Sequence, residues 1–251
     1  MRLNLGDDWH ATVTGEPLRA TPRFADGTLD LGPWNDSGER VRFLAGTFGS
    51  EPHLWDDPDV LRFDPDTRTL AGAEFQMPQE AVPADEAARV PLAPAVVPGG
   101  LRAEQVRDFR HPMSTVLCRA PGDTVLTCLR DLAVLDEALD ARIGIAPDVA
   151  LLVQCGAVVG WSLTDPVRHV TTGFAAPAPE PPAPATRRLF SECLDLITVP
   201  ALVDGLVDGE PAALARLHAA DDALRTQRED RQRAHALREL ISTYVADHGG
   251  R

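Results

Sequence analysis

The chain has 251 residues, 44% of them apolar, which is enough to bury a hydrophobic core in one large domain or two modest ones. Its 38 Asp and Glu residues outnumber its 24 basic residues, and the formal charge of −14 disfavours binding to nucleic acid or to an anionic membrane surface. Every basic residue is Arg, so Schiff-base chemistry and phosphate binding through a P-loop Lys are excluded.

The cysteines and the first residues bear on the compartment of the protein. Cys118, Cys128, Cys155 and Cys193 form no C-x-x-C pair, and no apolar run opens the sequence. We therefore expect reduced thiols, a cytoplasmic location, no structural metal site and no cofactor. Cys118 and Cys128 fall in apolar segments and are expected to be buried, whereas Cys155 falls in a turn and is expected to be exposed.

Residues 1–78 are expected to form antiparallel β-structure. Asp26-Gly27 is the preferred pair for a type I′ hairpin turn, and this turn would place Phe24 opposite Leu29. Further strands are expected at three places, which are 41–45, 60–63 and 70–75. The last two are joined by residues 64–68, whose composition favours a turn over a calcium loop.

Residues 79–100 form a proline-rich connection with one expected helical turn near 85–89. Residues 101–174 mix strand and helix patterns, with strands expected at 114–120 and 124–130. Leu132, Leu135, Leu139 and Ile143 recur at helical spacing, with Gly144 as the expected C-cap. A hairpin follows at 149–163, and its near-continuous apolar sequence requires cover on both faces.

Residues 175–185, Ala-Ala-Pro-Ala-Pro-Glu-Pro-Pro-Ala-Pro-Ala, are typical of a polyproline spacer between a body at 1–174 and a helical tail at 186–251. Thr186 is expected to cap a helix that ends before Pro200, and Pro211 to open another. Residues 225–233 contain no large apolar side chain, so this stretch is expected to face water or to break the helix.

These patterns together predict the fold class α+β. We expect a mostly antiparallel β N-terminal body with packed helices, followed by a helical C-terminal region.

The richest polar cluster in the sequence lies at 51–59, between two expected strands. His53, Asp56 and Asp57 are the candidate catalytic residues, with His53 as a base oriented by one of the carboxylates. The structural alternative is a tight turn pinned by Trp55. If nearby loops met at one end of a sheet, they would form an aromatic-lined acidic ligand pocket. Its candidate ligand-binding residues are Trp9, His10, Trp34 and Trp55, with Arg110 and His111 supplying a cation.

No common catalytic signature is intact, since the sequence has no G-x-S-x-G elbow, no H-E-x-x-H pair and no Walker loop. We therefore expect a non-enzymatic intracellular factor that binds a protein partner, such as an immunity protein or an accessory protein of a biosynthetic enzyme. The alternative is a small-molecule enzyme or ligand-binding protein that uses the acidic and aromatic residues around His53, Asp56 and Asp57. Self-association through the C-terminal helices is a third hypothesis.

Overall fold

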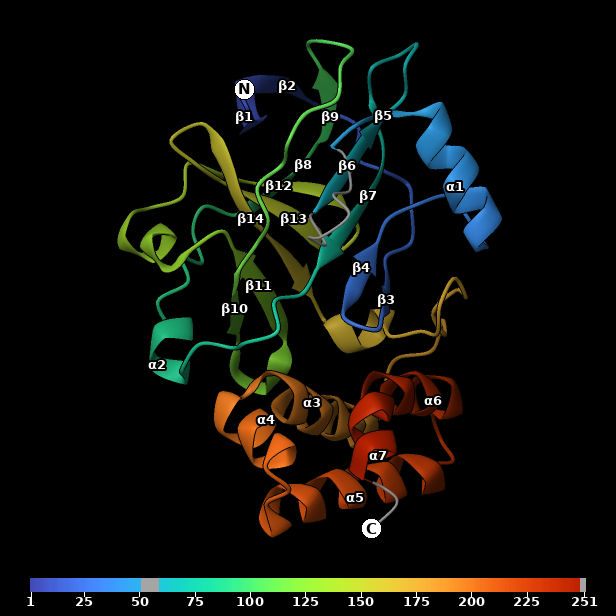
Figure 1. Ribbon diagram of the computed structural model, residues 1–251. Coiled ribbons are helices and arrows are strands. Elements are labelled where there is room, and N and C mark those ends of the chain that lie inside the picture. The colour runs from blue at the N-terminus through green and yellow to red at the C-terminus, as the bar shows by residue number, and fades with distance from the viewer. Residues whose placement is uncertain (51–58, 249–251) are drawn as a thin grey trace.

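The computed structural model describes residues 1–50 and 59–248. Its fold is α+β, as the sequence predicts, with a strand-rich N-terminal body above a cluster of C-terminal helices (Figure 1). Two sheets, mostly antiparallel, make up the body. Within the described residues, no helix is long and apolar enough to cross a membrane.

The smaller sheet contains the predicted Asp26-Gly27 hairpin. Its strand order is β3-β4-β7-β6-β5. Phe24 pairs with Leu29, and Asp26 and Gly27 have φ of 50° and 75°, so the type I′ hairpin is confirmed. The predicted strands at 60–63 and 70–75 are also confirmed. The strands are β3 (Arg23–Ala25), β4 (Thr28–Asp30), β5 (Phe48–Gly49), β6 (Val60–Phe63) and β7 (Leu70–Gln76).

Helix α1 (Ser37–Gly46) packs beside the smaller sheet. The prediction of a strand at 41–45 is wrong, because these residues belong to this helix. The Asp36 side chain accepts a hydrogen bond from Glu39 N at 2.7 Å, and Glu39 Oε2 accepts one from Asn35 N at 2.8 Å. This reciprocal capping starts the helix and outweighs the strand preference of the β-branched and aromatic residues that follow.

The larger, nine-stranded sheet curls until its two ends meet. Its main order is β8-β12-β13-β14-β1-β2-β9, with β11 and β10 branching from β14. One residue separates β8 from β9, so a single segment pairs with β12 at one end and with β2 at the other. A Cβ atom at Gly100 would lie 2.0 Å from the Glu16 carbonyl oxygen, so only Gly fits there. The strands are β1 (Arg2–Gly6), β2 (Trp9–Thr14), β8 (Val96–Pro98), β9 (Gly100–Ala103), β10 (Val116–Arg119), β11 (Val125–Leu129), β12 (Ala141–Ala146), β13 (Val149–Gln154) and β14 (Ala157–Thr164).

The helix predicted from Leu132 to Ile143 is wrong. Only a short 3-10 turn, η2 (Leu132–Asp136), forms before β12 begins, and Gly144 lies inside that strand. Ile143 pairs with Leu151 and is buried, so long-range strand pairing overrides the helical spacing. The predicted hairpins are confirmed as β10–β11 around η1 (Pro121–Asp123) and as β13–β14, and the expected helical turn appears as α2 (Ala84–Ala87).

Five helices form the described part of the tail, up to residue 248, and proline opens three of them. Pro184, Pro200 and Pro211 stand at the first positions of α3, α4 and α5, where the missing N–H costs nothing. The predicted end of the first helix before Pro200 and the start at Pro211 are confirmed. The predicted Thr186 cap is wrong, because α3 begins at Pro184 and Thr186 is buried within it. The helices are α3 (Pro184–Thr198), α4 (Pro200–Val207), α5 (Pro211–Thr226), α6 (Arg231–Leu240) and α7 (Ser242–His248).

The tail packs against the body and shares its core. One cluster of buried apolar residues runs through both parts, and within it the ring of Phe190 on α3 meets Phe24 on β3 edge-on at 6.3 Å. Asp195 on α3 forms an ion pair of 2.8 Å with Arg119 on β10. Helix α3 also lies against η1 and η3 (Pro166–His169) at the end of the body.

A buried arginine holds the proline-rich segment between body and tail, residues 175–185, in place. Arg233 is 1% exposed, forms an ion pair with Asp230, and donates hydrogen bonds to the carbonyl oxygens of Ala178 at 2.7 Å and Glu180 at 2.8 Å. The helix does break between α5 and α6, as predicted. The expectation that all of 225–233 faces water is wrong, because backbone carbonyls satisfy Arg233 inside the protein.

Candidate functional site

The predicted catalytic residues His53, Asp56 and Asp57, together with Trp55, lie outside the described residues. Their roles therefore stay predictions. The described end of the same polar cluster is Asp59, the residue before β6.

Asp59 is enclosed in the core. It is 1% exposed, and its carboxylate accepts hydrogen bonds from Gln76 N at 3.0 Å and from Ser114 Oγ at 2.9 Å. Burial raises its pKa from 3.8 to about 6, because the charged form loses its hydration. Such a pKa would suit a general base. The carboxylate, however, is buried between β7 and the segment before β10, where a substrate does not reach it.

The structure brings Trp9 next to the segment that contains Arg110 and His111. The Trp9 ring stacks on Phe109 at 4.1 Å, and its Nε1 donates to the Arg107 carbonyl oxygen at 3.1 Å. Trp9 is 1% exposed, so its ring offers almost no surface to a ligand.

His111 is buried and Arg110 is exposed, although the two are neighbours. His111 Nδ1 lies 2.6 Å from the Leu5 carbonyl oxygen, and burial lowers the pKa of the imidazole to about 4, so it is neutral at pH 7. Arg110 donates its backbone N–H to the Asp7 carboxylate at 3.2 Å. His10, on β2, is half-buried.

Trp34 lies on the other side of the smaller sheet from Trp9. Its Nε1 donates to Asp30 Oδ2 at 2.9 Å, and its ring packs against Phe43 of α1. A Cβ atom at Gly72 would lie 3.3 Å from the Trp34 ring, so Trp34 covers the face of the sheet that Gly72 shares with its partner Arg62. Trp9 contacts Phe63, the next residue of β6, whose side chain points to the opposite face. The two tryptophans therefore anchor two separate layers and do not meet.

The cysteine predictions are confirmed for burial and exposure. Cys118 and Cys128 are buried and Cys155 is exposed. Burial raises the pKa of the Cys118 thiol to about 11 and that of Cys193 to about 12, which makes both poor nucleophiles.

Among the hollows on the described surface are three with volumes of about 470, 250 and 500 Å³. The first two lie among the tail helices and the third on the body. The buried groups with a displaced pKa that line none of these three hollows are Asp59, His111, Cys118, Cys128, His169 and Cys193.

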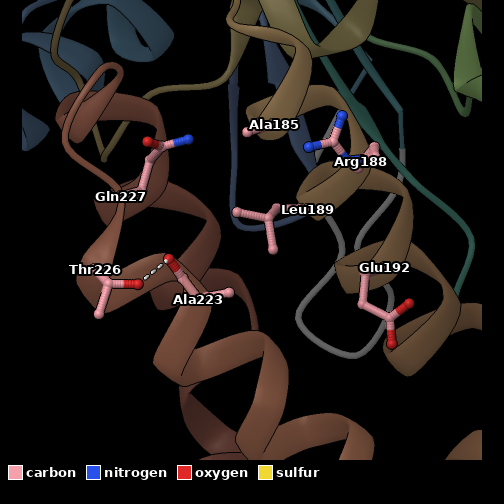
Figure 2. A pocket seen from close by; sticks show the side chains of 7 residues that line it. All are labelled: Ala185, Arg188, Leu189, Glu192, Ala223, Thr226 and Gln227. Atoms are coloured by element: carbon pink, nitrogen blue, oxygen red, sulfur yellow. Dashed lines mark hydrogen bonds between the residues drawn. The ribbon is translucent and has the colours of Figure 1, made fainter.

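The 470 Å³ hollow is an open groove between α3 and α5, and Figure 2 shows its lining side chains. Leu189 projects from α3 into the space between the helices, and Ala223 faces it from α5. Glu192 on the rim pairs with Arg216 at 2.8 Å. Arg188 is exposed and has no acidic partner among the described residues. The groove thus combines an apolar floor with an unneutralised cation.

Sequence reasoning did not find this groove. The spacing of Leu189 and Phe190 marks an apolar helix face, but it does not show that Phe190 is buried while Leu189 is left half-exposed beside α5. That difference depends on the path of a helix that starts 22 residues later in the chain.

Within the part of the chain that the structure describes, no three His, Cys, Asp or Glu side chains gather as a metal site requires. Comparisons of the chain with protein-family models, with curated proteins and with solved structures give no match.

Proposed function

We propose that this protein is a non-enzymatic protein-binding factor that receives a segment of its partner in the groove between α3 and α5. The partner segment places an apolar side chain on Leu189 and a carboxylate beside Arg188. The observation that carries the proposal is the half-exposed Leu189 next to an arginine without an acidic partner among the described residues. An apolar anchor beside one charged group is a common arrangement at protein interfaces.

The charge of the tail supports a partner segment that carries a carboxylate. Residues 184–251 contain 11 Asp and Glu against 9 Arg, whereas residues 1–183 contain 27 against 15. The formal charge is therefore −2 for the tail and −12 for the body. An acidic segment is repelled by the body but meets little net repulsion at the groove.

The placement of the titratable groups favours binding over catalysis. A catalytic acid, base or nucleophile with a displaced pKa must reach substrate in a cavity. Here Asp59 and His111 lie inside the core, with hydrogen bonds to neighbouring groups.

The rival proposal, a small-molecule enzyme, depends on His53, Asp56 and Asp57. It predicts that His53→Ala and Asp57→Asn each abolish biological activity while the protein stays folded. Full activity in both folded variants contradicts it.

A photo-cross-linking experiment tests the groove. A photoreactive residue at Thr226, on the groove rim, is compared with one at Val41, which is 62% exposed on α1. We expect an adduct with one partner protein from position 226 and not from position 41, and we expect Arg188→Glu to remove that adduct.

Equal adducts from both positions contradict the proposal. Adducts that contain only a second copy of this chain also contradict it, and they favour self-association through the tail instead. Deletion of the tail would not separate these outcomes, because Phe190 and its neighbours belong to the shared core.

A further inference from the structure

The body carries a hollow of about 500 Å³ whose charge differs from that of the protein as a whole. Its walls are the segment that leads into β3, the loop after β4, and the proline-rich segment, which runs beside β3 (Figure 1). Arg19 and Arg23 line it, and no Asp or Glu is among its lining residues. Arg23 is paired with the Asp30 carboxylate at 2.7 Å, so Arg19 supplies the uncompensated positive charge of the hollow on a protein with a formal charge of −14.

Arg23 is rigidly held at this hollow. It is 7% exposed, and it donates to the carbonyl oxygens of Trp34 at 2.7 Å and Gly32 at 3.0 Å and to the Asp30 carboxylate at 2.7 Å. A guanidinium has five N–H groups, and Nε of Arg23 has no acceptor within the described structure. That Nε atom is enclosed by protein, so Arg23 forms a fixed wall of the hollow and does not offer it a free donor.

Arg19 and Thr21 supply hydrogen-bond donors. Arg19 is exposed and has no acidic partner in the described parts of the chain, and Thr21 also lines the hollow. Leu18, Ala71 and Pro177 supply apolar wall. Hydrogen-bond donors at the hollow favour a ligand rich in hydrogen-bond acceptors, and the apolar wall favours a ligand with a carbon skeleton.

We propose that this hollow binds a small organic anion. The carboxylate or phosphate oxygens of the anion accept hydrogen bonds from the guanidinium of Arg19 and contact Arg23, and its carbon skeleton rests on Leu18 and Pro177. The volume lies within the range of small-ligand sites. This site is separate from the partner groove, which lies among the tail helices.

The binding of the anion would also affect the proline-rich segment. Pro177 precedes Ala178, whose carbonyl oxygen is held by Arg233. A bound anion would contact the same segment from the body side, next to its attachment to α6.

The test measures thermal unfolding of the full chain with three probes, which are benzoate, phenyl phosphate and uncharged benzyl alcohol. When the concentration of a bound anion is ten times its dissociation constant, the anion should raise Tm by about 3 °C or more. We expect this rise with at least one of the two anions and not with benzyl alcohol. The comparison of benzoate with phenyl phosphate shows which oxyanion the site prefers.

Arg19→Gln should abolish the rise and leave the Tm without ligand unchanged, because Arg19 is exposed. Arg228→Gln, an exposed change on the tail at a residue that lines none of the three hollows, is the matched control and should keep the full rise. Ala71→Leu places a larger side chain in the hollow while both arginines are kept, and it should also abolish the rise. The proposal is overturned if neither anion raises Tm up to 50 mM (about the limit of millimolar binding), or if Arg19→Gln and Ala71→Leu respond like the wild type.

Discussion

The body and the tail differ in where they keep their ionisable groups. The body carries a formal charge of −12 and encloses Asp59 and His111 in its core, whereas the tail is close to neutral and leaves Arg188 open beside an apolar groove. The net acidity of the protein therefore does not indicate where the proposed binding sites lie. Both described arginine sites, the groove and the body hollow, are local exceptions to the net charge.

The two regions nevertheless share one hydrophobic core. The buried cluster is continuous from β1 to α6, and the proline-rich segment between body and tail is fixed to α6 through Arg233. Differences in charge between body and tail thus coexist with a shared core. The predictions below test how strongly each contact joins the two.

The largest expected effect comes from Arg233. Arg233→Met keeps the volume of the side chain but leaves the buried Asp230 carboxylate without its cation. We expect a loss of about 3–5 kcal/mol in the free energy of unfolding, measured by urea denaturation. Arg228→Met, an exposed change in the same arginine-rich stretch, should alter it by less than about 0.5 kcal/mol. A loss below about 1 kcal/mol for Arg233→Met would show that this arginine does not fasten the segment.

His111 should make the body sensitive to acid. Its folded pKa of about 4 lies below its ordinary value of 6.5, so the unfolded state takes up a proton first as the pH falls. Relative to His111→Gln, the wild type should lose on the order of 3 kcal/mol of unfolding free energy between pH 7 and pH 4. Parallel pH profiles for the two proteins would contradict this.

Asp59 should act in the opposite direction. Its folded pKa of about 6 lies above its ordinary value of 3.8, so the carboxylate destabilises the fold progressively as the pH rises from about 4 to about 6. The unfolding free energy of Asp59→Asn minus that of the wild type should grow by on the order of 3 kcal/mol between pH 4 and pH 7.5. A difference that stays flat or shrinks with pH would show that Asp59 is not desolvated.

The smallest expected effect comes from a surface ion pair between body and tail. Arg187 and Asp165 lie 2.5 Å apart, but both side chains are about a third or more exposed. Arg187→Gln should cost less than about 1 kcal/mol in the same denaturation experiment. A cost above about 2 kcal/mol would mean that this pair, and not the shared core, joins the two regions.

Local sequence signals were enough to predict the hairpins. The predictions that failed concern segments whose structure is determined by contacts with residues far away in the sequence. Asp26-Gly27 has only one favourable turn type, so its register followed from the sequence. The burial of Arg233 depends on carbonyl oxygens more than 50 residues earlier in the chain, and no local pattern shows them. The start of α1 did carry a readable signal, the Asp36 and Glu39 capping pair, which the strand-like residues after it obscured.

The candidate sites were less predictable than the fold. Trp9 and Trp34 are chemically suited to a ligand pocket, yet each anchors a different buried layer. Arg19, Arg23 and Arg188 are ordinary in the sequence and become distinctive only through the charges that surround them in space. Charge in three dimensions, not residue type, separates a binding arginine from a structural one.

The affinity of the cross-linked partner for the wild type, Arg188→Glu and Arg19→Gln tests the proposed function most directly. We predict that Arg188→Glu weakens binding by about ten-fold or more, because it places like charges together at the groove, and that Arg19→Gln binds as the wild type does. Binding of Arg188→Glu with wild-type affinity would contradict the assignment of the groove as the partner site.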